Sequence, residues 1–121
     1  MRIKCITLKV DNSQIPLIYQ NYTGYLEIGS EFWVFGIRFY KCITYFCIFD
    51  GHHLIEVPSD FFEIVDNKVS NEWTIKIMGN GGVSLWPELF YVDMFLENFG
   101  EREVLERKAF EPLKARIEAN L

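Results

Sequence analysis

Two neighbouring segments, residues 32–40 and 42–49, constrain the fold of this chain more than any other part of it. Both are dense in aromatic and β-branched residues, which favour β-strands. Their apolar residues are nearly continuous rather than alternating, and this pattern is typical of strands whose two faces are both covered. We therefore expect two strands that other elements cover on either side.

The rest of residues 1–83 also predicts strands and turns. Apolar and polar residues alternate over 3–10, which indicates a half-buried first strand with Ile6, Leu8 and Val10 on one face. Residues 22–29 are expected to form a loop that leads into a short strand. The other expected elements are strands at 54–57, 61–65 and 73–78, turns at 11–13, 50–53 and 79–82, and a break at 58–60.

After Val83 the spacing of apolar residues becomes helical. Pro87 is placed as in the first turn of a helix, and we expect a helix over 89–99 that Gly100 ends. Its main apolar stripe would consist of Leu89, Val92, Phe95, Leu96 and Phe99, with Phe90 and Met94 as a second stripe.

A second helix is expected to follow from Glu101. Apolar residues repeat at every fourth position in it, namely Leu105, Ala109, Leu113, Ile117 and Leu121. Pro112 lacks a backbone N–H, so it should kink or split this helix near Phe110. The sequence therefore predicts an α+β fold, in which a small antiparallel barrel or curled sheet over 1–83 is followed by two helices over 84–121.

Length and composition indicate one domain with its own core. The chain has 121 residues, of which 50% are hydrophobic. No segment approaches the ~18 uncharged apolar residues of a membrane span, and the start lacks the apolar run of a secretion signal. The three cysteines, Cys5, Cys42 and Cys47, are expected to be free thiols that act as small buried apolar side chains. We expect a reducing cytoplasm as the compartment.

Motifs that would carry chemistry are weak. Asp50, His52 and His53 resemble a metal cluster, but adjacent histidines on a strand point to opposite faces. The glycine-rich segment 79–82 lacks the Lys and Ser/Thr that follow a phosphate-binding loop. We therefore expect no cofactor, no metal and no catalysis. A small enzyme that uses His52 or His53 is the weakest alternative left open.

The acidic residues are unevenly distributed along the chain. Residues 59–106 hold ten acids and three bases, whereas 1–58 are balanced. Large apolar residues lie among these acids, and aromatic groups ringed by one sign of charge suit an interface with a cationic partner. The simpler alternative is that the acidic residues are ordinary solvent-exposed residues of a helix, strands and turns. Nucleic acid is disfavoured as a partner because the acidic middle would repel phosphate.

Residues 26–66 resemble SH3-like barrel modules. The first part of the pattern is Leu-x-x-Gly-x-x-Phe-x-Val, which begins at Leu26. A predicted strand that ends at Asp50 follows. The last part is Pro-x-x-Phe-Phe-Glu-Ile-Val-Asp, which runs from Pro58 to Asp66. In size, charge and layout the whole chain resembles small bacterial immunity proteins of toxin–immunity systems, including those of contact-dependent growth inhibition. This resemblance implies a small, acidic, non-catalytic cytoplasmic inhibitor of a basic toxin domain, such as a nuclease.

The first hypothesis is therefore a protein-binding inhibitor that occludes a basic partner protein. The residues expected to bind this partner are Asp60, Glu63, Asp66, Glu72, Trp86, Glu88, Phe90, Tyr91, Asp93 and Glu97. The alternative is an SH3-like binding or regulatory module for a peptide or a protein subunit, with a surface around Tyr22, Tyr25, Phe39 and Tyr40. A homodimer through the stripe of Phe90 and Met94 also stays open.

Overall fold

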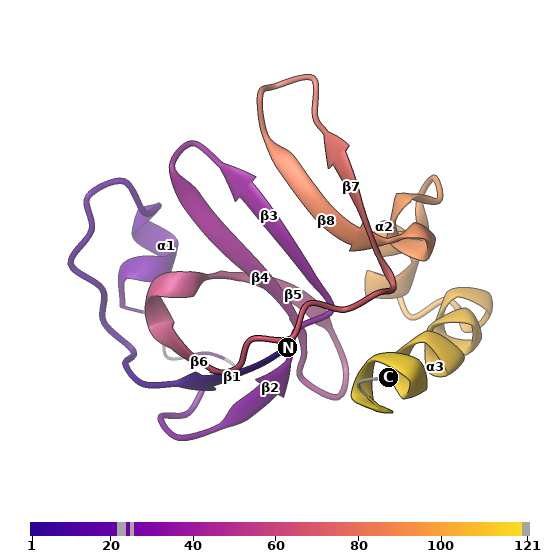
Figure 1. Ribbon diagram of the computed structural model, residues 1–121, viewed down its shortest axis with the longest axis horizontal. Coiled ribbons are helices and arrows are strands. Elements are labelled where there is room, and N and C mark those ends of the chain that lie inside the picture. Colours follow the sequence, from indigo (N-terminus) through magenta and orange to yellow (C-terminus); the bar gives the residue numbers. More distant parts are fainter. Residues whose placement is uncertain (22–23, 25, 120–121) are drawn as a thin grey trace.

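Figure 1 shows the computed structural model, which describes residues 1–21, 24 and 26–119. Within these residues the strands form two antiparallel sheets. The smaller sheet has the order β2-β1-β6 and consists of Glu31–Trp33, Arg2–Cys5 and Phe62–Asp66. The larger sheet has the order β5-β4-β3-β8-β7 and consists of Leu54–Pro58, Ile43–Phe49, Gly36–Tyr40, Val83–Pro87 and Trp73–Ile77. Over the described residues, the two sheets do not close into a barrel.

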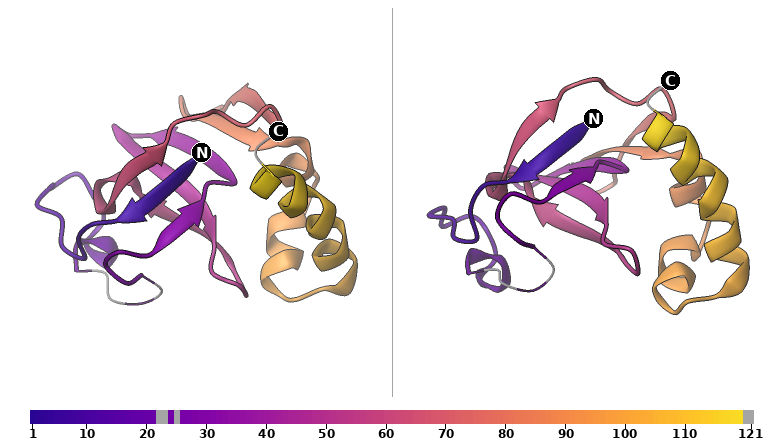
Figure 2. Two further views of the ribbon diagram at one scale, coloured as in Figure 1. Left: turned by 60° about the horizontal axis from the view of Figure 1, so that its bottom comes forward. Right: turned by 90° about the horizontal axis from the view of Figure 1, so that it is seen from below.

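The helices are short apart from the last one. A single turn, α1 (Leu17–Gln20), lies in the long connection between β1 and β2, and a 3₁₀ turn, η1 (Ser59–Phe61), joins β5 to β6. After β8 come the 3₁₀ turn η2 (Glu88–Tyr91), the helix α2 (Phe95–Gly100) and the helix α3 (Val104–Ala119). In Figures 1 and 2, α2 and α3 lie together at one end of the molecule, α1 lies at the other, and the smaller sheet lies between them on the side of α1.

Strand β4 is buried on both faces, as its composition predicts. Phe46 and Ile48 point into a core that lies between the two sheets and also contains Ile3 and Phe62. Cys47, whose side chain points the opposite way, belongs to a second core beneath the C-terminal helices. The expected fold class, an α+β chain with a small antiparallel curled sheet followed by two helices, is confirmed.

Phenylalanine rings dominate the second core. The ring of Phe110 on α3 lies 5.1 Å from that of Phe99, 5.2 Å from that of Phe49 and 5.3 Å from that of Phe35 between ring centroids. Tilted and edge-on ring pairs at such distances stabilise the fold beyond what the burial of their apolar area contributes. This cluster holds α2 and α3 on the outer face of the larger sheet, next to Phe35 and Cys47.

Two expectations about the strands were wrong. The first strand ends at Cys5, and its buried residues are Ile3 and Cys5 rather than Ile6, which is exposed. Pairing with β2 on one side and β6 on the other selects that face. The expected strand over 32–40 is two strands, because the chain changes sheets at its middle: the N–H of Val34 bonds to Met1 and that of Phe35 bonds to Cys47. Residues 26–29 form a loop with a turn at Gly29, where φ is +92°, and lead into the short strand β2, as expected; residues 22, 23 and 25 of that segment lie outside the described residues.

The helical expectations also need correction. Residues 83–87 form β8, so the expected helix start at Trp86 is wrong, and the helical spacing applies only from Phe95. Met94 has a left-handed backbone with φ of 61°, which separates η2 from α2. Helix α3 continues through Pro112, so of the expected kink or split the split does not occur. Its buried residues are Phe110, Leu113 and Ile117. Leu105 and Ala109 are exposed, and Leu121 lies outside the described residues.

This register of α3 can be tested by truncation. We expect Phe110→Ala to lower the free energy of unfolding by about 3–5 kcal/mol, because it leaves a cavity among four rings. Leu105→Ala is the matched control, since Leu105 is 79% exposed, and its effect should stay below about 0.5 kcal/mol. Urea denaturation followed by tryptophan fluorescence measures both. A larger loss for Leu105→Ala than for Phe110→Ala would contradict the observed register.

Candidate functional site

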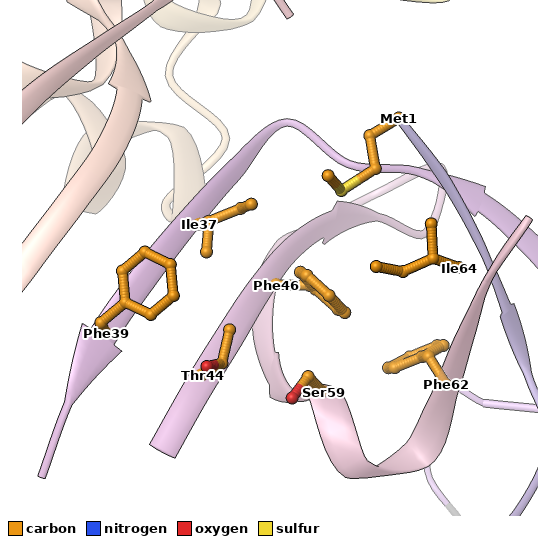
Figure 3. Close-up of a pocket in the computed structure, with 8 residues that line it drawn as sticks. All are labelled: Met1, Ile37, Phe39, Thr44, Phe46, Ser59, Phe62 and Ile64. Atoms are coloured by element: carbon orange, nitrogen blue, oxygen red, sulfur yellow. The ribbon is translucent and has the colours of Figure 1, made fainter. Parts of the chain in front are cut away.

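An open apolar groove lies at the seam between the two sheets. It has a volume of about 410 Å³ and is lined by Met1, Ile37, Phe39, Thr44, Phe46, Ser59, Phe62 and Ile64. We call it the seam groove. Figure 3 shows Phe39, Ile37 and Thr44 on one side of it and Phe62 and Ile64 on the other, with Phe46 between them and the side chain of Met1 reaching in from the end. The groove therefore lies where the sheets fail to close.

The floor of the seam groove is buried and its two rims are exposed. Phe46 and Ile37 belong to the core between the sheets. Phe39 on β3 is 41% exposed and Ile64 on β6 is 53% exposed. Two large apolar side chains on opposite rims of one hollow offer contact area that a partner can cover.

The apolar surface continues from the groove onto the hairpin of β7 and β8. Phe39 is opposite Val83, which is opposite Ile77, and these side chains share one face of the sheet. Both Ile75 and Ile77 are strongly exposed. The smaller sheet covers the inner face of β4 and leaves this part of β7 and β8 uncovered, as Figure 1 shows.

A second hollow adjoins the seam groove along β6. It has a volume of about 490 Å³ and is lined by residues 64–67, from Ile64 to Asn67. Ile64 lines both hollows. Together the two hollows follow β6 from Phe62 to Asn67. In the described part of the chain, β6 is an edge strand of its sheet.

Three of the predicted acidic residues lie beside these hollows. Asp60 in η1 and Glu63 on β6 are exposed, and Asp66 at the end of β6 lines the second hollow. The amide of Asn12 donates to Asp60 over 3.4 Å, and Asp66 accepts the backbone N–H of Lys68 at 3.0 Å. We call Asp60, Glu63 and Asp66 the seam acids.

The other predicted acidic residues lie elsewhere. Glu88 on η2, Asp93 in the segment that joins η2 to α2, and Glu97 on α2 are exposed, and we call them the helix-end acids. Figures 1 and 2 place these elements at the side of the molecule opposite β6, so the acids do not form one face. Glu72 is paired with Arg116 on α3, which ties the segment before β7 to the last helix.

The predicted aromatic anchors are largely internal. Phe90 is 4% exposed and stacks on Phe95, so it belongs to the core and is not an accessible anchor. The indole of Trp86 lies over Gly36, where a Cβ atom would come within 2.5 Å of its Cδ1. Of the expected second stripe only Met94 is exposed.

Tyr91 is held by hydrogen bonds within the chain. Its hydroxyl lies 2.7 Å from Oγ of buried Ser84 and donates to the carbonyl oxygen of Thr74 at 2.9 Å. The ammonium group of Lys76 lies 4.2 Å from the centre of its ring. This residue therefore joins β7, β8 and η2, and its polar end is occupied inside the fold.

The two histidines belong to a turn. One carboxylate oxygen of Asp50 accepts the backbone N–H groups of His52 at 2.8 Å and His53 at 2.6 Å. Partial burial opposes ionisation of Asp50, but these donors outweigh it and hold the pKa of its carboxyl below the ordinary value. The guanidinium of Arg107 stacks on Phe99 and donates to the carbonyl oxygen of His52, so the turn is also joined to α3.

The cysteines are free thiols in two environments. Cys5 and Cys47 are buried, and burial raises the pKa of both thiols, which disfavours the nucleophilic thiolate. Cys42 was expected to be buried as well, but it is exposed in the turn between β3 and β4, where its φ is +64°.

Sequence reasoning missed most of the seam groove. Of its lining residues, only Phe39 was expected to bind a partner, as part of the alternative SH3-like surface; Tyr22 and Tyr25 of that surface lie outside the described residues, and Tyr40 is partly buried beside Arg38. The period-two spacing of Phe62 and Ile64 was visible in the sequence. It could not show which strand would leave Ile64 uncovered.

Comparisons with known proteins do not add to this picture: no family model, no curated protein and no solved structure matches the chain. In residues 1–21, 24 and 26–119, no helix combines the length and the apolar character that crossing a bilayer requires.

The internal role assigned to Tyr91 can be tested by removing one oxygen. We expect Tyr91→Phe to lower the free energy of unfolding by about 1–3 kcal/mol, because it leaves the buried hydroxyl of Ser84 without its 2.7 Å partner. Tyr40→Phe at the tip of β3 is the control, with an expected change below about 0.5 kcal/mol. Equal stability of Tyr91→Phe and the unmodified chain in urea titrations would refute this role.

Proposed function

We propose that this chain is a non-catalytic protein-binding module that holds a segment of a basic partner protein in the seam groove. The observation that carries the proposal is the groove itself, an open apolar hollow of about 410 Å³ with exposed Phe39 and Ile64 on its rims. Apolar grooves that take up side chains are a recurring means by which protein modules hold a segment of a partner.

The charge of the partner follows from the acids around the groove. Asp60 precedes β6, and Glu63 and Asp66 lie on it. Lys4 and Arg2 on β1 are opposite Glu63 and Asp66, and the next bases along the chain are Lys68 and Lys76. Carboxylates at the rim of an apolar patch favour a cationic partner, and they increase the rate of encounter more than the final affinity. An excess of acids elsewhere on the molecule, including the helix-end acids, acts in the same direction.

In its specific form the proposal is an immunity protein that neutralises a cationic toxin domain, for example a nuclease. Such an inhibitor acts by covering the surface of its partner and needs no catalytic group, cofactor or metal. We place it in a reducing cytoplasm, in keeping with two buried free thiols and an exposed one.

The groove can be tested with a random library of phage-displayed dodecapeptides selected on the full chain. We expect enriched peptides that contain both Lys or Arg and aliphatic residues. Their affinity for Ile64→Asp should fall at least about tenfold, equivalent to about 1.4 kcal/mol, because a charged side chain replaces an apolar one on the rim of the groove. Ile28→Asp is the matched control, since Ile28 is an exposed isoleucine on the turn before β2.

Two results would overturn the groove as the binding site. One is the enrichment of peptides that bind Ile64→Asp and the unmodified chain equally well. The other is the loss of binding in Ile28→Asp but not in Ile64→Asp. Circular dichroism of both variants shows that the comparison is between folded proteins.

The two groups of acids allow a second test with an internal control. We expect the triple variant Asp60→Lys, Glu63→Lys and Asp66→Lys to bind the selected peptides at least about tenfold more weakly and to lose their salt dependence. The triple variant Glu88→Lys, Asp93→Lys and Glu97→Lys carries the same change of charge at the other end and should bind them with little change. The reverse result would move the site to η2 and α2.

The toxin-directed form has its own test in cells. The domain encoded beside this chain is expressed with and without it, and growth is followed. Rescue that is lost in Ile64→Asp supports an immunity function through the groove. Rescue that persists in Ile64→Asp, or the absence of rescue, refutes the immunity function through the groove. The more general proposal, a module that binds a basic protein segment, is then decided by the peptide experiments.

A further inference from the structure

We propose that the partner segment binds as an additional β-strand on the open edge of β6, with one row of its side chains in the seam groove. This inference rests on the proposed function and specifies its mode of recognition. Extended segments add to exposed sheet edges through main-chain hydrogen bonds, and pockets for alternate side chains provide the selectivity.

The backbone of β6 has hydrogen-bonding groups that point to this edge. The N–H of Ile6 donates to the carbonyl oxygen of Phe61 at 2.9 Å, and Lys4 is opposite Glu63. In an antiparallel ladder, residues that bond to the neighbouring strand alternate with residues that face away from it. The N–H and C=O groups of Ile64 therefore face the open edge, and so does the C=O of Phe62, whose N–H bonds to Ser59.

The two hollows lie next to each other along β6. The seam groove and the second hollow share Ile64 and follow β6 from Phe62 to Asn67. A strand of about six residues rises ~20 Å, so a segment of this length would lie along the whole edge. The side chain of Ile64 and its main-chain groups then contact the same segment.

Alternation along β6 specifies the pattern of that segment. Phe62 and Ile64 point into the groove, and Glu63 between them points to the opposite face of the smaller sheet. A register shift opposite Arg2 and Ile3 ends this alternation at Val65. An added strand would place its apolar residues beside Ile64 and the residues between them beside Glu63. Opposite charges on neighbouring strands stabilise the pair, so Lys or Arg is expected at these intervening positions.

Charge argues against two other arrangements. If a second copy of the chain added its own β6, the seam acids of both copies would lie along one seam. If the partner segment bound instead to the edge of β7, it would meet Lys76 near the end of that strand, where a cationic segment is repelled. Charged side chains, Lys above all, are a common protection of edge strands.

The test uses the ¹⁵N-labelled full chain and the heptapeptide Lys-Val-Lys-Val-Lys-Val-Lys as the probe. At saturation we expect hydrogen exchange of the Ile64 amide to slow at least about tenfold and the methyl resonance of Met1 to shift. Ile75 is the control amide: because Met78 N–H bonds to Gly82 on the other side, Ile75 faces the open edge of β7, and its exchange should not change.

Two further probes sharpen the result. The same heptapeptide with an N-methyl group on its central valine keeps the side chains but removes a donor, and we expect it to bind at least about tenfold more weakly. The heptapeptide with Glu in place of each Lys should leave both the Ile64 amide and the Met1 methyl unchanged.

Each outcome has one meaning. A shift of the Met1 methyl without protection of Ile64 refutes strand addition and leaves groove binding in place. Strand addition is also refuted if the phage-selected peptides bind and the heptapeptide does not. Failure of every peptide refutes the proposed function itself. Protection of Ile64 that depends on protein concentration and needs no peptide assigns the edge to a second copy and overturns the proposal.

Discussion

The two faces of β4 pack against different partners, and the rest of the structure depends on this division. Phe46 and Ile48 face the smaller sheet, whereas Cys47 faces the phenylalanine cluster of the C-terminal helices. Burial of large apolar side chains contributes about 1.5–3 kcal/mol each, so a strand buried on both sides is the strongest organising element of a small domain. The chain has to provide a layer for each face, and it uses a sheet for one and helices for the other.

The seam groove follows from how these layers are divided. The helices are anchored on the outer face near Phe35, and the smaller sheet covers the inner face over β4. The hairpin of β7 and β8 extends the larger sheet beyond that cover, so its inner face continues the groove with Ile75 and Ile77 exposed. Over the described residues, two sheets that do not close therefore combine an apolar floor with an unpaired edge of β6, the two features that recognition of an extended segment uses.

Local sequence patterns predicted secondary structure correctly where the conformation of a segment does not depend on the elements that pack against it. The strands at 43–49, 54–58 and 73–77 and the turn at 79–82 follow from composition and turn residues. Prediction failed where pairing or packing decided the outcome. The buried face of β1 depends on its two neighbouring strands. Phe110 lies in the core although Pro112 is two positions away, because its contacts with other rings outweigh one missing hydrogen bond.

The sequence by itself determined the fold class, the acidic balance and the absence of a strong catalytic motif, because these depend on composition and short-range pattern. The tertiary structure decided which residues form a site. It moved Phe90 and Tyr91 into the fold, paired Glu72 with Arg116, and separated the acids between β6 and α2. It also brought Met1, Phe39 and Ile64 together around one groove. Such contacts join residues distant in sequence, and only the packing of two sheets specifies them.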